Sequence, residues 1–558
     1  RELASAHVPR VSANGMAGKK RKSPTDALQR AAVVTGDGAD DDADDAALLP
    51  SGLPRPSLKL PKGTLPEPPK VKLPSAAEQL AMRGATDGAE LAASNLLHMQ
   101  LEALLDEVTV DYAKGATQPL DDWLRSFREA LLALPAAEPI VDGDALPLAT
   151  ELEPLAWRPP VRVVLTGSYL LRTQMQAGAD GLNIDLAIEL PSRCLKAKDH
   201  LDGRYGTRRQ LWLHHLAVLL SHPDSPEAWE PAPDDGAETD EAETAEAARE
   251  AIRAAAALCE GVHVISYGGD STWPILAISP KGLPHCLGQS RPLTIRLLPF
   301  VGLETFPPNR LRPARCCVRP HKSAANAPAG LATPRYNARL LSEAAHVPAL
   351  QAMHSVFAAD SRGSLRDAAV LLKLWARQRG FGGPLSSSPA PFSLSTAAEA
   401  GVSAAQSAEM SNALSPFVCT ALVAALAQRR VLTHAMSAAQ AFRVTVHWLA
   451  TKPSLAARPS GRAVDTSACL ALRPPRVALG LAVTPDEAAV SSLFLEHVTS
   501  GAHALVLLEP ISGCNLASGI SHGGMADVQH EARLAMRLLD TAAPPRTPPP
   551  AAIVNDGG

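Results

Sequence analysis

The stretch from residue 161 to residue 190 constrains the fold of this chain more than any other. It reads VRVVLTGSYLLRT and, after a short polar stretch, NIDLAIEL. The first run predicts a strand that ends in Gly167-Ser168, a pair small enough to let backbone and hydroxyl groups approach a triphosphate. The second run predicts another strand, on which Asn183 and Asp185 share one face because side chains alternate along a strand. We therefore expect a sheet with a polar pair beside a small-residue turn.

The predicted α/β domain covers residues 141–305. The runs GVHVISYGG, WPILAISP and LTIRLLP predict three more strands, and RRQLWLHHLAVLL predicts a long helix. Residues 224–250 interrupt this domain with eleven acids and one arginine. Because such a segment cannot bury an apolar face, we expect a disordered, solvated insertion.

Helical patterns precede and follow this domain. Residues 76–140 predict a helical N-terminal segment, whose second helix stops at Pro135. Residues 336–541 predict a mainly helical domain, in which SLRDAAVLLKLWARQRG has Ser364 as N-cap and Gly380 as terminator. FVCTALVAALAQRR, SAAQAFRVTVHWLA and VQHEARLAMRLLD predict further helices, and RVALGLAVT and HALVLLEP predict strands.

The ends of the chain differ from its middle. Residues 1–75 predict a disordered tail, and residues 542–558 a Pro-rich end. The chain begins at Arg1 rather than Met, so we expect a fragment or an incomplete gene model. Inside the tail lies a basic cluster of the kind that a nuclear import receptor grips, with a solvated patch as the alternative: Lys19, Lys20, Arg21 and Lys22.

Composition excludes several classes of protein. The formal charge of -4, from 53 basic and 57 acidic residues, gives by itself no hint of a polyanion partner. The eight cysteines form no CxxC pair, so we expect free thiols in a reducing compartment rather than a zinc site. No apolar stretch reaches the ~18 to 20 residues of a membrane span. We expect a soluble intracellular protein without a membrane partner.

The polar pair resembles a known metal site but departs from it. In nucleotidyltransferases of the polymerase-beta type, two carboxylates one residue apart follow a Gly-Ser pair, and a third acid from a neighbouring strand completes a site for two Mg²⁺ ions. Here Asn183 replaces the first acid, and only Asp185 remains. Glu189 lies roughly 13 Å along the strand, too far to share a metal. GVHVISYGG and WPILAISP contain no acid, and Asp270 falls in the turn between them. We expect a retained fold without catalysis, metal or other cofactor.

Several motifs occur in a fixed order along the chain: SNLLHMQLEALLDEV, GSYLLRT, NIDLAIELP, KDHLDGRYGTRRQLWLHHLA, TPRYN, LLKLWARQRG and HEARLAMRLLD. Together they resemble the Nrap family of nucleolar RNA-associated proteins, from about Ser75 to Asp540. LLKLWARQRG alone also resembles poly(A) polymerases. The resemblance implies a nucleotidyltransferase-like mixed sheet domain, followed by a mainly helical domain like that of poly(A) polymerases and oligoadenylate synthetases. Full-length members continue into a second such pair.

The same resemblance implies a function. Nrap proteins are non-catalytic scaffolds of the small-subunit processome, and they act in pre-ribosomal RNA processing and small ribosomal subunit biogenesis in the nucleus and nucleolus. The implied partners are pre-ribosomal RNA, an RRM-bearing ribosomal RNA-processing protein and a casein-kinase assembly. Two alternatives remain open: an active RNA-tailing nucleotidyltransferase that uses Asp185, and a protein-only adaptor without RNA contact.

Positive charge gathers in residues 306–335, which we expect to be a basic linker that holds RNA phosphates without reading sequence. The helix face of Arg366, Lys373 and Arg377, spaced i, i+7 and i+11, is a second candidate, with a solvated face as the alternative. By resemblance, Lys373 takes the position that faces the nucleotide's phosphates in polymerases. The candidates in the linker are Arg310, Arg312, Arg315, Arg319 and Lys322.

Two other patterns have simpler explanations. GISHG at residues 519–523 matches GxSxG but lies in a Gly-rich loop, without the strand, sharp turn and helix that a hydrolase nucleophile needs. His214 and His215 are neighbours on a predicted helix and point to different faces, which favours packing over metal binding.

Overall fold

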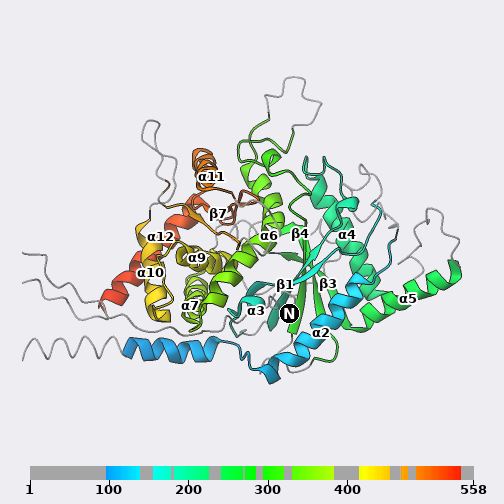
Figure 1. The fold of residues 1–558 in the computed structure, drawn as a ribbon, viewed down its shortest axis with the longest axis horizontal. Helices are drawn as coiled ribbons and strands as arrows, with labels where there is room; N and C mark the ends of the chain where they lie inside the picture. The colour runs from blue at the N-terminus through cyan, green and yellow to red at the C-terminus, as the bar shows by residue number, and fades with distance from the viewer. Residues whose placement is uncertain are drawn as a thin grey trace, which may run out of the picture. The chain divides into compact units, whose positions relative to one another are not determined.

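The computed structural model describes residues 96–137, 155–176, 181–224, 241–267, 270–283, 293–319, 330–381, 414–452, 466, 468–475 and 485–541. Several predicted features lie outside these residues: the tail at 1–75 with its basic cluster at 19–22, the strand at 476–484 and the end at 542–558. The described part of the chain contains a sheet region up to residue 319 and a helical region from residue 330 (Figure 1).

A five-stranded mixed sheet forms the centre of the sheet region. β2 pairs with β5 in parallel, whereas β1–β2, β5–β4 and β4–β3 are antiparallel. The strands agree with the runs of β-branched residues that predict them. In spatial order they are β1 (Val163–Thr166), β2 (Leu182–Glu189), β5 (Leu293–Phe300), β4 (Asp270–Pro280) and β3 (Cys259–Tyr267).

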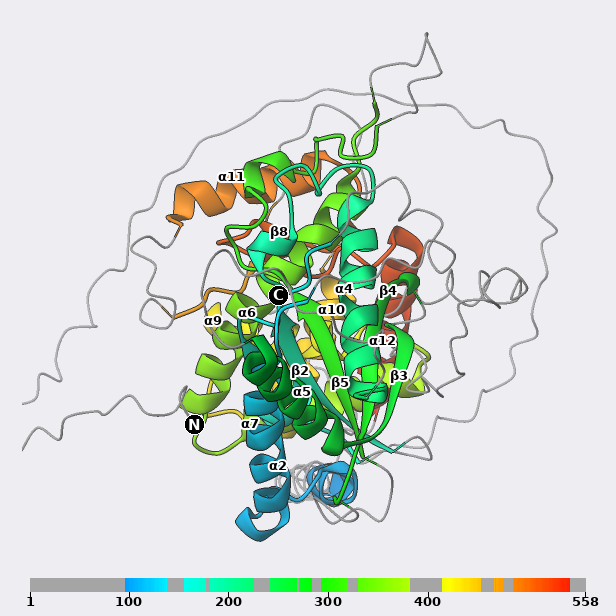
Figure 2. The same cartoon turned by 90° about the vertical axis from the view of Figure 1, so that its right-hand side faces the viewer.

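Four helices accompany the sheet, and residues 96–108 are also helical. Trp123 and Phe127 lie on the buried stripe of α2, which ends shortly before Pro135 as predicted. Figure 2 shows α4 and α5 in front of the strands, on one side of the sheet. The four are α2 (Lys114–Leu132), α3 (Gly167–Leu171), α4 (Arg204–Ser221) and α5 (Glu241–Ala257).

The predicted acidic insertion differs from the structure. Residues 241–250, which we expect to be disordered, belong to α5, and the C-terminal half of this helix buries Ile252 and Ala255. The Ala-rich sequence that follows the acids gives the helix an apolar face. The turns that contain Ile252 and Ala255 are held by this packing. Because extending a helix is easier than starting one, they support the acidic turns before them.

The helical region buries a second core, to which α7, α9, α10 and α12 all contribute and which Leu105 and Leu171 of the sheet region join. No helix in the described ranges is long and apolar enough to cross a membrane. A small sheet also forms, with β6 (Leu470–Ala471), β7 (Leu507–Glu509) and β8 (Cys514–Asn515), so that HALVLLEP is a strand over only three residues. The helices are α6 (Pro334–Ala359), α7 (Ser364–Gln378), α9 (Pro416–Gln428), α10 (Ala438–Thr451), α11 (Glu487–Thr499) and α12 (His522–Thr541).

The start of α7 differs in detail from the prediction. Ser364 is the first residue of the helix rather than its N-cap, because Gly363 precedes it in a left-handed conformation with φ of +77°. The carboxylate of Asp360 supplies the cap by accepting a hydrogen bond from the backbone N–H of Leu365 at 2.7 Å. Gly380 follows the helix with φ of +77°, as a terminator should.

The two faces of the sheet differ in what covers them. The even-numbered residues of β2 from 184 to 188 are buried in a core shared with α2, α4 and α5. The alternate residues point to the other face, where Ala187 packs with Val347 of α6. Asn183 and Asp185 therefore lie on the face toward the helical region.

Candidate functional site

A tight turn joins β1 to α3. Gly167 opens α3 with φ of +71°, a conformation that favours glycine. A Cβ atom here would lie 2.5 Å from Oδ2 of Asp185, so the close approach of that carboxylate also requires glycine. The structure thus places the Gly167-Ser168 turn beside Asp185, with Asn183 on the same strand face, as the sequence predicts.

Arg296 of β5 is the residue that sequence reasoning missed at this site. It stands opposite Asp185 in the parallel β2–β5 register, and its Nε donates a hydrogen bond to Oδ1 of Asp185 at 2.7 Å. Both side chains are largely buried, with 23% and 16% of their surface exposed. The neighbouring strand that could have supplied a third acid therefore supplies a cation. The available signal was the lone charge in the apolar run LTIRLLP.

The residues present do not fit a pair of magnesium ions. Mg²⁺ is held in proteins mainly by carboxylates and phosphates, and here Asp185 is already paired with a guanidinium, while Asn183 offers only a neutral oxygen. Glu189 is engaged elsewhere, in an ion pair with Arg162 at 2.9 Å. The donor set at this cleft lacks the negative charge that two divalent cations require.

Lys373 of α7 reaches the Gly-Ser turn from the helical region. Its Nζ donates to the Oγ of Ser168 at 3.3 Å, and to the carbonyl oxygen and Oγ1 of Thr173 at 3.0 and 2.9 Å. The residue is only 3% exposed, and burial lowers the pKa of its ammonium to about 8. The exposed basic helix face expected for this lysine is therefore not formed. Arg366 and Arg377 are half-buried, and Arg366 donates to the carbonyl oxygen of Phe357.

His346 of α6 makes a second contact across the cleft. Its Nε2 and the Oγ1 of Thr166 are hydrogen-bonded at 2.6 Å. Burial lowers the pKa of His346, and the nearby negative charge of Asp185 opposes that shift. The contacts of His346 and Lys373 tie α6 and α7 to the end of β1 and to the residues that follow it.

A buried network fixes α6 against the sheet region. Both oxygens of Glu343 are used: Arg209 of α4 donates to Oε1 at 2.8 Å, Trp273 of β4 donates to the same oxygen at 2.5 Å, and Tyr205 donates to Oε2. Each of these side chains is at least nine-tenths buried. Because a buried charge without its partner is costly, this network holds α6, and with it His346, in one position.

The described part of the predicted basic linker is held against the rest of the fold by hydrogen bonds. Asn337 is fully buried, and its Nδ2 donates to the backbone carbonyls of Arg312 and Arg315 at 3.0 and 2.9 Å. The guanidinium of Arg312 forms an ion pair with Glu496 of α11 at 2.9 Å. Arg310 and Arg315 are exposed to solvent. Lys322 lies outside the described residues.

The GISHG pattern and the His214-His215 pair both have structural roles. The Oγ of Ser521 accepts a hydrogen bond from the backbone N–H of Gly524 at 3.0 Å, so it caps the start of α12. His215 is buried, which lowers its pKa to about 4, whereas the neighbouring His214 is exposed. Within the ranges that the structure describes, no group of three His, Cys, Asp or Glu side chains is arranged to hold a metal ion.

Two models of one protein family match this chain. The model described as Nrap protein domain 1 matches residues 130–230 and 253–359, and the model described as Nrap protein PAP/OAS-like domain matches residues 364–544. The boundary between them falls between α6 and α7. The first match contains the mixed sheet with its Gly-Ser turn, and the second contains most of the helical region, which confirms the predicted fold class.

Curated relatives from animals and yeast are similar over much of this chain. Nucleolar protein 6 of Mus musculus is 26% identical over 468 residues, covering 81% of this chain and 32% of the relative. Nucleolar protein 6 of Homo sapiens is 26% identical over 472 residues, with the same coverage. The U3 small nucleolar RNA-associated protein 22 of Saccharomyces cerevisiae is 23% identical over 412 residues, covering 68% and 28%. The chain spans about a third of the length of the first two relatives.

Among solved structures, a mutant of the Cid1 poly(U) polymerase bound to MgATP matches this chain weakly. This structure has a TM-score of 0.35 and 10% sequence identity, and the match covers 80% of this chain and 95% of that one.

Proposed function

This chain belongs to the Nrap family, and we propose that it acts as a non-catalytic scaffold of the small-subunit processome in pre-ribosomal RNA processing and small ribosomal subunit biogenesis. The names of its relatives support the nucleolar and RNA-associated parts of this proposal. The proposed location is the nucleus and nucleolus, with the basic cluster at residues 19–22 as the import signal. The RRM-bearing and casein-kinase partners stay predictions of the family resemblance.

The ion pair between Asp185 and Arg296 is the observation that carries the non-catalytic part of the proposal. Two-metal phosphoryl transfer needs several carboxylates that share two cations. Here the one carboxylate of the motif is neutralised by a guanidinium at 2.7 Å. An incoming Mg²⁺ would have to displace that guanidinium and would then face it as a like charge.

The contacts across the cleft support the scaffold part. Lys373 hydrogen-bonds to Ser168 and Thr173 of the sheet region, and His346 hydrogen-bonds to Thr166. The Lys373 contacts link α7 of the helical region to the sheet region, and a scaffold benefits from a fixed relation between its parts. We propose that the former cleft now serves as a joint between the two regions.

The RNA-contact part concerns the basic linker. Arg310 and Arg315 are exposed on a backbone that Asn337 holds in place, so they can meet phosphates at little further cost in conformational entropy. Arg312 and Arg319 are in ion pairs with Glu496 and Asp202, and a phosphate would have to compete with those carboxylates.

An extension assay tests the proposal against the active-transferase alternative. The 558-residue chain is incubated with an RNA primer, labelled ATP, UTP or CTP, and Mg²⁺ or Mn²⁺. We expect no extension by the parent chain. Product from the parent that disappears in Asp185→Ala, but persists in the surface control Asp540→Ala, would overturn the proposal.

A further inference from the structure

A second basic stretch lies in the sheet region, between the end of β2 and the start of α4. We call residues 192–204 the basic loop, and residues 306–319 of the predicted linker the basic segment. Three cations of the basic loop are exposed and the fourth is half-buried at the first position of α4. They are Arg193, Lys196, Lys198 and Arg204.

Both acids of the basic loop are engaged by arginines. Asp199 is buried, forms an ion pair with Arg208 of α4 at 2.8 Å, and accepts the backbone N–H of Lys196 at 2.7 Å. Asp202 is paired with Arg319 of the basic segment. The carboxylates are therefore used within the fold, and the outward charge of the loop is positive.

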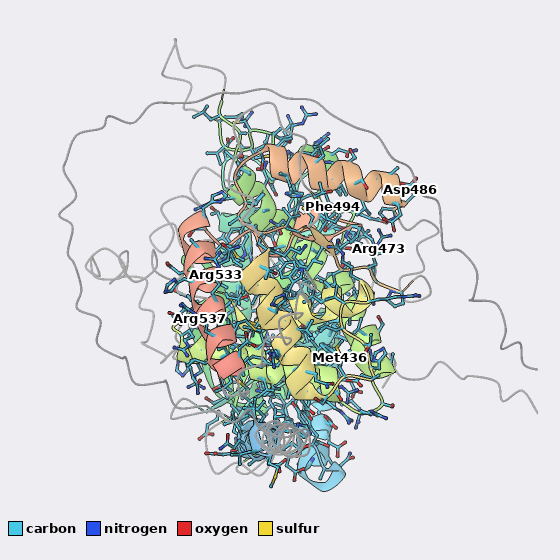
Figure 3. All side chains as sticks on the ribbon, turned by 90° about the vertical axis from the view of Figure 1, so that its left-hand side faces the viewer. Met436, Arg473, Asp486, Phe494, Arg533 and Arg537 are labelled. Carbon is cyan, nitrogen blue, oxygen red and sulfur yellow. The ribbon has the colours of Figure 1, made fainter. Side chains whose placement is uncertain are left out.

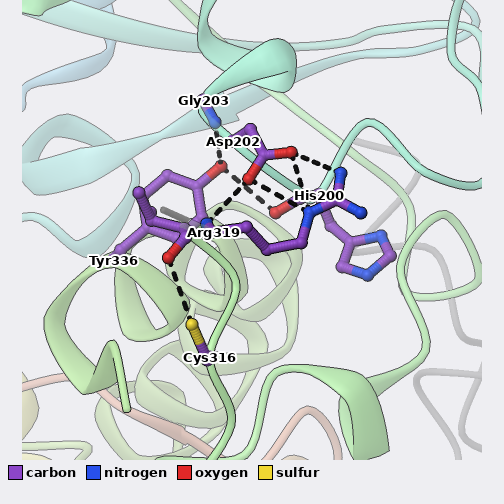
Figure 4. A network of polar contacts seen from close by, with 7 residues as sticks. His200, Asp202, Gly203, Cys316, Arg319 and Tyr336 are labelled. Carbon is purple, nitrogen blue, oxygen red and sulfur yellow. Dashed lines mark hydrogen bonds and ion pairs between the residues drawn. The ribbon is translucent and has the colours of Figure 1, made fainter. Parts of the chain in front are cut away.

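The basic loop and the basic segment are joined directly, as Figure 4 shows. Asp202 accepts hydrogen bonds from the backbone N–H of Arg319 at 2.8 Å and from its guanidinium Nε at 3.0 Å. Tyr336, in the first turn of α6, accepts the backbone N–H of Gly203 and donates to the carbonyl oxygen of His200, both at 3.2 Å. Segments more than 100 residues apart in sequence thus form one surface.

The charges of the two stretches act on the same groups. Burial is the main cause of the lowered pKa of His200, and the positive charges of Arg310 and Arg319 lower it further. Hydrogen bonds from Arg319 hold the pKa of Asp202 below its usual value, and the charge of Arg204 adds to this effect. Arg204 of the basic loop and Arg310 and Arg319 of the basic segment therefore act on the same small part of the surface.

We propose that the basic loop and the basic segment form one composite surface that binds the phosphate backbone of RNA without reading its bases. The inference rests on the proposed RNA contact of the basic segment and extends it to residues of the sheet region. Neither stretch exposes an aromatic ring, because Phe306 is buried, so base stacking cannot be the main source of affinity. Phosphate contacts of this kind give binding that depends steeply on salt and little on sequence.

A binding titration with paired charge reversals tests this surface. Lys198→Glu with Arg204→Glu changes the basic loop, and Arg310→Glu with Arg315→Glu changes the basic segment. The matched control is Arg533→Glu with Arg537→Glu on α12, which Figure 3 shows in the helical region. The probe is a fluorescent single-stranded RNA of about 20 nucleotides in two unrelated sequences, titrated with the full chain across a range of salt concentrations. Thermal melting of each variant checks that it folds.

Each paired reversal in the surface should weaken binding roughly tenfold at about 0.1 M salt, and should reduce the slope of log K against log salt by about 1.4, the value for two lost phosphate contacts on a single strand. The control should do neither, and both RNA sequences should bind alike. If only the Arg310 and Arg315 pair weakens binding, this inference is wrong and the proposed RNA contact stands. If neither pair does, both fail. Binding of a poly-glutamate peptide as tight as that of RNA would also overturn the inference, because the surface would then suit an acidic protein.

Discussion

The cleft beside the Gly-Ser turn and the composite basic surface use the same kinds of residue in opposite ways. In the cleft, the cations point inward: Arg296 is paired with Asp185, and Lys373 donates its hydrogen bonds to Ser168 and Thr173. The result is a buried contact between two regions in which both cations already have partners within the fold.

At the basic surface, the acids are the residues that are already engaged. Asp199 is buried against Arg208, and Asp202 is held by Arg319, so the remaining cations face solvent. The comparison shows that the identity of a charged residue does not decide its role. What decides it is whether the fold already supplies its partners, either a group of opposite charge, as for Arg296, or neutral hydrogen-bond acceptors, as for Lys373.

The largest expected effect is a change in pH-dependent stability on replacing Lys373 by Met. The pKa of Lys373 is about 8 in the folded chain, against the ordinary lysine value of 10.5, so between these limits the unfolded chain binds more protons and stability rises with pH. We expect the free energy of unfolding of the parent to rise relative to Lys373→Met over this window by at most about 3 kcal/mol. Denaturant unfolding of both proteins from about pH 7 to 10.5 measures the difference.

Lys281→Met is the matched control, since Lys281 is an exposed lysine in the turn after β4. Its stability should follow that of the parent at every pH. If Lys373→Met also follows the parent, water reaches the ammonium group of Lys373, and the cleft is open rather than filled.

The second effect concerns the missing carboxylates. Combining Asn183→Asp with Arg296→Asp gives Asp185 two acidic neighbours, which should repel one another without a cation. Mn²⁺ should then stabilise the double variant by roughly 2.7 kcal/mol at a concentration one hundred times its dissociation constant. Thermal unfolding with and without Mn²⁺ measures this gain.

The parent and Asn183→Asp alone should show no such gain, because the guanidinium of Arg296 still occupies Asp185. Stabilisation of the parent by Mn²⁺ that is lost in Asp185→Ala would contradict the comparison. It would mean that Asp185 binds a metal ion despite its ion pair with Arg296. An ion pair within the fold would then not prevent a charged residue from binding a ligand.

Local sequence patterns predict much of the fold. They predict little of the charge pairing that distinguishes the site beside the Gly-Ser turn from the basic surface. Alternating β-branched runs identify the strands, and alternation places Asn183 and Asp185 on one face. The order β1-β2-β5-β4-β3 is set by long-range packing, however, so local patterns do not show which strand lies beside Asp185. The true neighbour is β5 with Arg296.

The same limit applies to Lys373 and the basic loop. Helical spacing shows that Arg366, Lys373 and Arg377 share a stripe, but it does not show whether that stripe meets solvent or another part of the chain. Only the fold reveals that Lys373 is buried and that Asp202 and Arg319 meet. A pattern within one element predicts its faces, whereas the partner of each face depends on elements distant in sequence.

The smallest expected effect is at the surface, where Asp202→Asn removes the carboxylate that holds Arg319. The two side chains are 27% and 55% exposed, so water screens the pair, and the new amide oxygen can still accept the backbone N–H of Arg319. We expect a loss of about 0.5 kcal/mol in the free energy of unfolding. RNA binding should become slightly tighter, since the surface loses an acid.

Asp540→Asn, which breaks the exposed pair with Arg443, is the control for stability and should leave RNA binding unchanged. A loss above about 2 kcal/mol would show that Asp202 acts as the buried charges of the cleft do, and the contrast between the two regions would then fail at this residue.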